Sequence, residues 1–219
     1  MDTKLDIVVA VPTAGTVPMK FAHSLAGLMA FVCQNGIRTM PEITHTMISM
    51  DILQSSNWIT NREQLAYRAI EAGRTHMMFL DDDMEFEPQV LEILLGRRQP
   101  IVLTNYLTKT DNPEFMAVDL NGQRIATTET SVGIRPVDFA GFGVSVINMD
   151  VFKAMEPPRF QPFYTPEDRS YSTEDVPFFR KARELGFQVY LDHDASKLIK
   201  HVGQHTWVWS MLKPNSETA

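Results

Sequence analysis

The sequence predicts an α/β fold in which a mostly parallel sheet is covered by helices on both faces. Short β-branched apolar runs alternate along the chain with segments of helical periodicity, which is typical of this class. In addition, 44% of the 219 residues are hydrophobic, enough for one sizeable core. Because this length falls short of two ordinary domains, we expect a single domain over residues 1–219.

The first half of the chain repeats a strand followed by a helix. Residues 7–11 form a β-branched apolar run that ends in a turn, and from Met19 apolar residues recur at helical spacing until Gly36. A second helix is expected to open at a capping box formed by residues 60–63 and to close at Gly73. The remaining elements expected here are strands at 43–50, 77–80 and 100–106 and a helix that begins near Pro88.

The second half is less regular. We expect a helix entered through Asp150, and a helix that opens at residues 173–175 and ends at Gly186. Residues 157–171 contain four prolines and several aromatics and are expected to form a loop, either a lid or a packed segment. Expected strands are 115–118, 144–147, 188–191 and 197–202.

Composition excludes several classes of partner. The formal net charge of −7 and the pI near 5.3 argue against nucleic acid as the main partner, because nucleic-acid binders usually carry a basic surface. No apolar run approaches the ~20 residues of a membrane span, and the N-terminus lacks a signal-peptide pattern. The single cysteine, Cys33, is expected to be a small core residue. These features together predict a soluble protein in the cytoplasm.

Three consecutive carboxylates directly follow one of the expected strands. Asp81, Asp82 and Asp83 come after the apolar run 77–80, and in open α/β sheets ligands bind beyond the carboxyl ends of the strands. Adjacent carboxylates repel one another, and a divalent cation relieves that repulsion while accepting oxygen ligands. The triplet alone also fits a solvated turn, so the preceding strand is what favours a ligand site.

This pattern resembles the GT-A glycosyltransferases, and more loosely their family 2, over roughly residues 6–203. The resemblance implies a Rossmann-like domain with a nucleotide-binding half at about 1–106, an acceptor and metal-completing half at about 107–203, and a polar tail. It also implies that Asp81 contacts the nucleotide ribose and counts among the metal ligands. Asp83 would hold Mn²⁺ or Mg²⁺ against the donor's diphosphate, and Asp82 takes an ambiguous middle position.

Residues 172–175 resemble the Thr-Glu-Asp motif of inverting family 2 enzymes. By this resemblance Asp175 is the base that removes the proton of the acceptor hydroxyl, with Glu174 beside it. A carboxylate suits this role because a sugar hydroxyl becomes a good nucleophile only as its proton leaves. The same residues are also typical of a helix start, with Thr173 as N-cap and the two acids in the first turn.

His201 is the candidate that completes the metal site. Residues 192–194 and 200–203 resemble the late strand of GT-A enzymes in which a histidine ligates the ion, and a neutral imidazole can join carboxylates around a divalent cation. His193 and His205 are weaker candidates. The Gln-x-x-Arg-Trp motif of processive family 2 synthases is absent, so a processive polymerase is not expected.

Six further positions match the family pattern less specifically. Four of them stand where such enzymes hold the base, ribose and diphosphate: Pro12, Thr13, Asp51 and Arg62. Arg62 fits a solvated helix residue equally well. Gly141 and Gly143 resemble the glycine-containing loop beside the donor sugar, where a missing side chain lets the backbone approach a ligand, although a β-bulge accounts for them as well.

The sequence therefore predicts a metal-dependent glycosyltransferase that moves one sugar from a nucleoside-diphosphate sugar to an acceptor hydroxyl with inversion. A retaining transferase and a non-catalytic nucleotide-sugar-binding module stay open as alternatives. A sugar-nucleotide pyrophosphorylase is disfavoured because residues 12–20 lack its glycine-rich loop with Arg and Lys. A haloacid-dehalogenase-like phosphohydrolase is disfavoured because its acidic motif follows the first strand. The oligomeric state is open.

Overall fold

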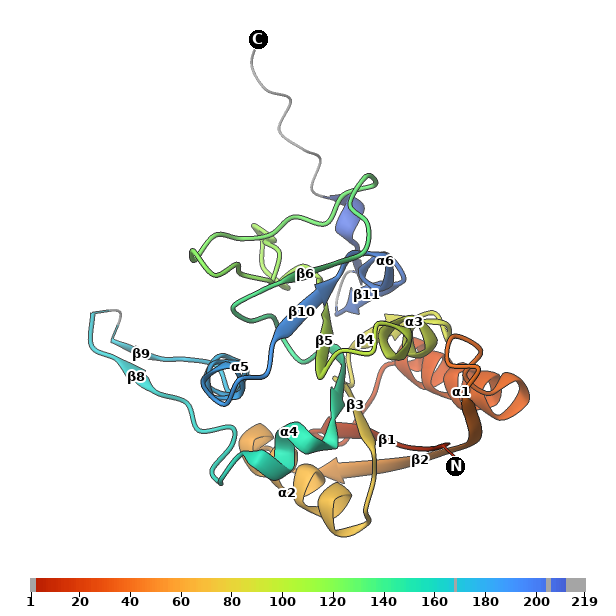
Figure 1. Ribbon diagram of the computed structural model, residues 1–219. Coiled ribbons are helices and arrows are strands. Elements are labelled where there is room, and N and C mark those ends of the chain that lie inside the picture. Colours follow the sequence, from red (N-terminus) through yellow and green to blue (C-terminus); the bar gives the residue numbers. More distant parts are fainter. Residues whose placement is uncertain (1–2, 168, 204–205, 212–219) are drawn as a thin grey trace.

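The computed structural model describes residues 3–167, 169–203 and 206–211 (Figure 1). Its centre is a seven-stranded sheet with the order β2-β1-β3-β7-β5-β10-β6. The strands are β1 (Thr3–Thr13), β2 (Ile43–Gln54), β3 (His76–Leu80), β5 (Ile101–Thr104), β6 (Ile134–Pro136), β7 (Val144–Asn148) and β10 (Val189–Asp192). Only β6 and β7 run against the other five. The predicted α/β class with a mostly parallel sheet is confirmed.

Helices cover both faces of this sheet, because successive strand side chains point to opposite sides. On one face, Ile7 and Val9 of β1 pack with α1 and α3, and on the other Val8 and Ala10 pack with α2, α4 and α5. The helices are α1 (Met19–Asn35), α2 (Trp58–Glu71), α3 (Val90–Gly96), α4 (Met149–Ala154) and α5 (Asp175–Glu184). Among the described residues, none of the helices has the length and apolar character needed to cross a bilayer.

A second, smaller sheet lies beside the carboxyl end of β3. Its strands, in the order β12-β11-β4, are β4 (Met84–Phe86), β11 (Ile199–Val202) and β12 (Thr206–Trp207). β11 is antiparallel to β4, with His201 opposite Met84. Residues more than a hundred positions apart in the chain therefore meet directly after Asp83. The remaining elements are a short hairpin of β8 (Tyr164–Thr165) and β9 (Ser170–Tyr171), α6 (His193–Ser196) and the 3₁₀ turn η1 (Trp209–Met211).

The start of α2 differs from the prediction, and so does the environment of Cys33. Asn57 caps α2 by accepting a hydrogen bond from the Thr60 backbone N–H, so the helix starts before the expected capping box. Cys33 is exposed. It follows Val32, which faces the sheet, and one residue further round a helix turns the side chain away by about 100°.

Two predicted elements of the second half also differ. The strand expected at 115–118 forms only isolated bridges, because the side chain of Asn105 accepts from the Ala117 N–H and donates to the Ile125 carbonyl in place of a neighbouring strand. α4 begins at Met149 rather than at Asp150. The loop expected at 157–171 contains the β8–β9 hairpin.

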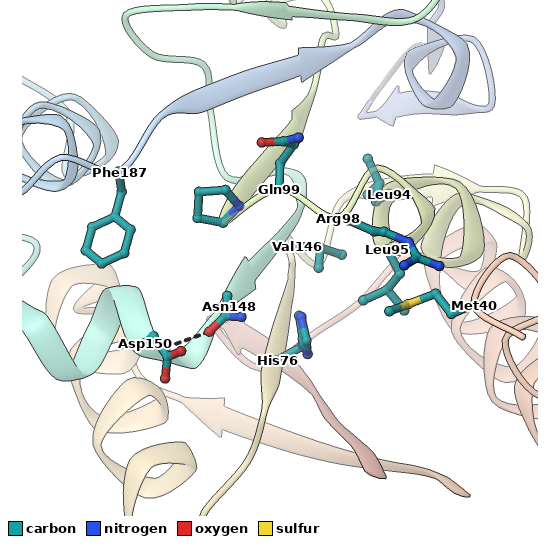
Figure 2. A pocket seen from close by; sticks show the side chains of 11 residues that line it. Met40, His76, Leu94, Leu95, Arg98, Gln99, Val146, Asn148, Asp150 and Phe187 are labelled. Carbon is teal, nitrogen blue, oxygen red and sulfur yellow. Dashed lines mark hydrogen bonds between the residues drawn. The ribbon is translucent and has the colours of Figure 1, made fainter. Parts of the chain in front are cut away.

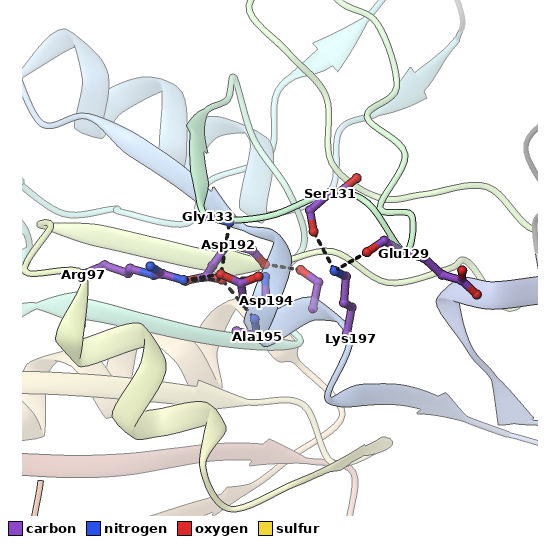
Figure 3. Close-up of polar contacts among 9 residues, drawn as sticks. Arg97, Glu129, Ser131, Gly133, Asp192, Asp194, Ala195 and Lys197 are labelled. Carbon is purple, nitrogen blue, oxygen red and sulfur yellow. Dashed lines mark hydrogen bonds and ion pairs between the residues drawn. The ribbon is translucent and has the colours of Figure 1, made fainter. Parts of the chain in front are cut away.

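An ion-pair cluster fixes the region from which β11 starts (Figure 3). The guanidinium of Arg97 donates to the fully buried Asp192 and to Asp194, at 2.6 Å in each case. Asp192 also caps α6, and Asp194 accepts from the backbone N–H of Gly133. Lys197 donates to two carbonyls of the segment before β6. The cluster therefore holds α6 and the start of β11, and with them the strand that carries His201.

Candidate active site

A cavity of about 360 Å³ lies beyond the carboxyl end of β3. Six of its lining residues are ones that the sequence predicted: Arg62, Asp81, Asp82, Asp83, Glu174 and His201. The others are residues that the sequence analysis did not single out: Trp58, Tyr106, Thr108, Lys109 and Met116. Side chains from widely separated parts of the chain thus meet at the sheet edge where ligands of α/β proteins bind.

The three consecutive carboxylates diverge to different partners. The backbone N–H of Asp81 donates to the Gly143 carbonyl at 2.9 Å, which fixes the triplet beside the start of β7. Asp81 pairs with Arg62, whereas the Thr13 hydroxyl donates to Asp82. Burial raises the pKa of Asp81 and of Asp82 and outweighs these contacts. Thr13, at the end of β1, therefore contacts one of the residues that line the cavity.

Arg62 is a buried cation at the base of the cavity, only 3% exposed. Its Nη2 donates to Asp81 at 2.7 Å and its Nε to Glu174 at 3.1 Å. The guanidinium also lies 4.5 Å from the ring centre of Phe142. Burial lowers the pKa of Arg62, but the two carboxylates raise it more. The interpretation of Arg62 as a solvated helix residue is wrong, because a buried charge of this kind depends on its paired carboxylates.

Asp83 and His201 meet because β11 pairs with β4. The backbone N–H of Val202 donates to the Asp83 carbonyl at 2.7 Å. The Nδ1 of His201 lies 2.7 Å from the carbonyl oxygen of Leu107, which can only accept, so Nδ1 carries a hydrogen. The other ring nitrogen, Nε2, then faces Oδ2 of Asp83 at 3.4 Å.

The ammonium of Lys109 also contacts Oδ2 of Asp83. Burial raises the pKa of Asp83, but the neighbouring side chains of His201 and Lys109 lower it below its usual range. The other oxygen, Oδ1, is buried and has no hydrogen-bond partner among the residues that the structure describes. The carboxylate of Asp83 is therefore held ionised, with one oxygen still able to accept.

Asp83 and His201 are the residues that could hold a divalent cation. In a neutral ring with a hydrogen on Nδ1, Nε2 of His201 is an acceptor that faces the Asp83 carboxylate, and a cation between the two could bond to both. A hydrogen bond from Nδ1 to a backbone carbonyl is the usual outer contact of a metal-bound histidine. Asp81, the third predicted ligand, is engaged by Arg62. Within the described part of the chain, no three Asp, Glu, His or Cys side chains form a metal site by themselves.

Asp175 lies at the start of α5, with only 6% of its surface exposed. Its Oδ1 accepts from the Thr173 hydroxyl and from the Val176 N–H. Burial raises the pKa of Asp175 to about 6, although these hydrogen bonds oppose the shift. Thr173 is not the N-cap that the sequence suggested, because α5 begins after Glu174 and the hydroxyl of Thr173 bonds to Asp175.

Gly141 and Gly143 make room for the ring of Tyr106, a residue that the sequence analysis missed. A Cβ at Gly141 would lie 1.9 Å from the Tyr106 hydroxyl and 3.6 Å from Oδ2 of Asp175. A Cβ at Gly143 would lie 2.5 Å from the same ring, and its N–H donates to the Tyr106 hydroxyl at 3.2 Å. Tyr106 lines the cavity, so its hydroxyl connects the cavity with the surroundings of Asp175.

Three further predicted positions, Asp51, His193 and Pro12, do not line the cavity. Asp51 pairs with Arg68 of α2 at 3.0 Å, and β2 continues past it. The ring of His193 is buried against the Thr127 hydroxyl. Pro12 lies within the pairing of β1 with β2. His205 lies outside the described residues.

A second cavity of about 470 Å³ opens at the opposite edge of the sheet (Figure 2). His76 at the start of β3 and Asn148 at the end of β7 line it, together with Arg98 and Phe187. Burial lowers the pKa of His76. None of the residues predicted for the site lines this cavity, so the carboxyl edge carries the candidate site.

Two solved structures align with this chain over most of its length. The crystal structure of A197 from STIV aligns with a TM-score of 0.56 and 16% identity over 93% of this chain and 94% of that one. At this identity the likeness shows the fold alone. The catalytic domain of Drosophila β1,4-galactosyltransferase 7, crystallised with xylobiose, gives a TM-score of 0.49 and 13% identity over 99% of this chain and 76% of that one. No protein-family model matches the chain, and no curated protein matches its sequence.

Proposed function

We propose that this chain is a glycosyltransferase that transfers one sugar from a nucleoside-diphosphate sugar to an acceptor hydroxyl, with a divalent metal ion and with inversion. One observation carries the proposal. The Asp83 carboxylate and Nε2 of His201 face each other 3.4 Å apart at the carboxyl edge of the sheet. This pair supplies an oxygen and a nitrogen that can coordinate a Mn²⁺ or Mg²⁺ ion. Two ligands leave other coordination positions of the ion for phosphate oxygens.

The charge of the cavity supports a donor that binds together with a cation. Four carboxylates line it, those of residues 81–83 and Glu174, against two positively charged side chains, Arg62 and Lys109. A diphosphate alone would add to this excess of negative charge. A bound divalent ion, held by Asp83 and His201, would offset the charge of the diphosphate and stabilise it as a leaving group. In this proposal Thr13, Asp81 and Asp82 contact the nucleoside.

Asp175 is the proposed base. With a pKa of about 6, it is ionised at neutral pH and more basic than an ordinary aspartate. It accepts the proton of the acceptor hydroxyl while the hydroxyl oxygen bonds to the anomeric carbon. The bond from that carbon to the diphosphate breaks, and its electron pair leaves with the diphosphate. The oxygen attacks opposite the leaving group, which inverts the configuration.

Exposed aromatic rings on the β8–β9 hairpin support the proposal that the acceptor is a sugar. The rings of Tyr164 and Tyr171 lie 5.2 Å apart, with 49% and 70% of these residues exposed. The hairpin projects from the body of the protein beside α5 (Figure 1) and leads directly into Glu174 and Asp175. Exposed aromatic rings offer flat apolar surfaces with a polar group at one end. By contrast, Phe160 is fully buried in the core, as the packing interpretation of this segment predicted.

One observation favours the alternative of a nucleotide-sugar-binding module without catalysis. Asp175 is buried and does not line the cavity. In a binding module its carboxylate would only stabilise the start of α5. The two functions differ in turnover, since only a transferase would release nucleoside diphosphate in proportion to acceptor glycosylated.

The test is a screen of nucleoside-diphosphate sugars and simple glycoside acceptors with Mn²⁺, read out as released nucleoside diphosphate and as glycosylated product. We expect product with the wild type, loss of turnover with retained donor binding in Asp175→Asn, and loss of both in Asp83→Asn. Asp51→Asn, which removes a carboxylate outside the cavity, is the matched control and should stay active. Binding without turnover in the wild type would favour the module. NMR of the product anomer separates inversion from retention.

A further inference from the structure

Lys109 places a positive charge where the two proposed metal ligands meet. Its Nζ forms an ion pair with Oδ2 of Asp83, the same oxygen that faces Nε2 of His201 at 3.4 Å. Both members of the ion pair are partly buried, with side-chain exposures of 28% and 30%. Two cations close to one carboxylate oxygen repel each other strongly in a partly buried site. Lys109 and a divalent ion therefore exclude each other at this oxygen.

The loop that carries Lys109 is fixed by its own hydrogen bonds. The N–H of Thr108 donates to the Glu114 carbonyl at 2.9 Å, and the Glu114 N–H donates to the Thr108 hydroxyl at 3.0 Å. The Thr110 hydroxyl donates to the carbonyl of Asn112 at 2.7 Å. With the backbone held, the long side chain of Lys109 can leave Asp83 by rotation about its own bonds while the ammonium stays within the cavity that it lines.

We propose that Lys109 is a tethered cation that occupies the metal position in the free protein and moves to the diphosphate when a divalent ion binds. This inference rests on the proposed function. Lys109 neutralises Asp83 before ligands arrive, so the ionised carboxylate is kept in place. Once the ion takes over that role, the ammonium pairs with a phosphate oxygen, for which lysine is a common partner.

This movement of Lys109 makes the binding of the metal ion and the binding of the diphosphate depend on each other. A metal ion alone must displace Lys109 from Asp83. Loss of a partly buried ion pair of this kind weakens the binding of the ion alone by about fivefold. A metal–diphosphate complex offers the displaced ammonium a new partner and removes that penalty. The protein thus favours the ion together with the diphosphate over the free ion.

The experiment compares Lys109→Gln with the wild type in two titrations. Mn²⁺ alone is followed by the loss of the free-ion electron paramagnetic resonance signal, and the preformed Mn²⁺–pyrophosphate complex is followed by calorimetry. We expect Lys109→Gln to bind Mn²⁺ alone about fivefold more tightly and Mn²⁺–pyrophosphate more weakly than the wild type. The Lys153→Gln control separates these shifts from the effect of a general loss of positive charge.

Two further variants serve as controls. Lys109→Arg keeps the charge and should remain near the wild type in the Mn²⁺ titration. Lys153→Gln removes the same charge from an ion pair with Asp150 elsewhere in the fold and should change neither titration. If Lys109→Gln binds Mn²⁺ alone no more tightly than the wild type, the inference is overturned while the proposed function stands. If the wild type binds no Mn²⁺–pyrophosphate, the proposed function itself fails.

Discussion

Replacing Asp175 with asparagine should stabilise the protein at alkaline pH. The carboxyl group titrates at about 6 in the folded chain against an ordinary value of 3.8, chiefly because of burial. Folding therefore favours its protonated form. The stability that this group contributes is fully present below pH 3.8 and is lost as the pH rises through about 6. Asparagine cannot ionise, and its amide oxygen can still accept from the Thr173 hydroxyl and the Val176 N–H.

The size of the effect follows from the shift. A rise in the pKa of Asp175 from 3.8 to about 6 corresponds to a change in the free energy of unfolding of roughly 3 kcal/mol at most. For a domain of this length, each kcal/mol moves the melting temperature by about 2 to 4 °C. At pH 8, Asp175→Asn should therefore melt up to about 6 to 12 °C above the wild type.

The assay is thermal unfolding followed by circular dichroism between pH 4 and pH 8, for the wild type and Asp175→Asn. The difference in melting temperature should grow as the pH rises through about 6. Asp51→Asn, which removes a carboxylate from the surface-facing pair with Arg68, controls for the loss of a negative charge. A difference that is constant with pH, or a variant that is less stable at pH 8, would refute the reasoning.

Three further predictions concern the same site. Arg62→Met should lower the free energy of unfolding by about 3 to 5 kcal/mol in urea titrations, because it leaves two carboxylates without their shared cation. The control Arg68→Met should lower it by under about 1 kcal/mol. Equal losses in the two variants would contradict a buried ion pair at Arg62. Gly141→Ala should destabilise the protein, because the added Cβ clashes with the ring of Tyr106. Gly27→Ala, with open space around its Cβ in α1, should raise the free energy of unfolding by about 0.5–1 kcal/mol. A Gly141→Ala variant with an unchanged melting temperature would argue against the close approach of Tyr106 to Gly141. Tyr171→Ser should raise the KM for acceptor and leave the KM for donor unchanged, and an unchanged acceptor KM would remove the hairpin from the acceptor site.

The sequence predicted the elements of the parallel half well because their patterns are local. Each buried strand alternates its side chains between two helical layers, so β1 and β3 appear as apolar runs. The place of Asp81, Asp82 and Asp83 followed from such a run. No local sequence pattern indicated that the antiparallel β7 lies between β3 and β5, because strand order depends on contacts between residues far apart in the chain.

The contacts within the site were harder to predict, and for different reasons. Arg62 precedes Leu65, Ala66 and Ala69 at helical spacing, all on the buried face of α2, so its burial could have been predicted from that periodicity. Lys109 comes from an irregular loop, where no periodicity indicates direction. The glycines before β7 were expected to admit a ligand, and in the structure the ring of a tyrosine lies against them.

In the proposed function, a diphosphate binds this chain through an ion held by Asp83 and His201. The most direct measurement is a thermal-shift titration of nucleoside diphosphates with Mn²⁺ and with excess chelator, on the wild type and Asp83→Asn. A ligand at 100 times its Kd adds about 2.7 kcal/mol, so we expect the melting temperature of the wild type to rise by about 5 to 10 °C with Mn²⁺. We expect no rise with chelator or in Asp83→Asn. An equal rise with chelator, or in Asp83→Asn, would contradict binding through an ion held by Asp83.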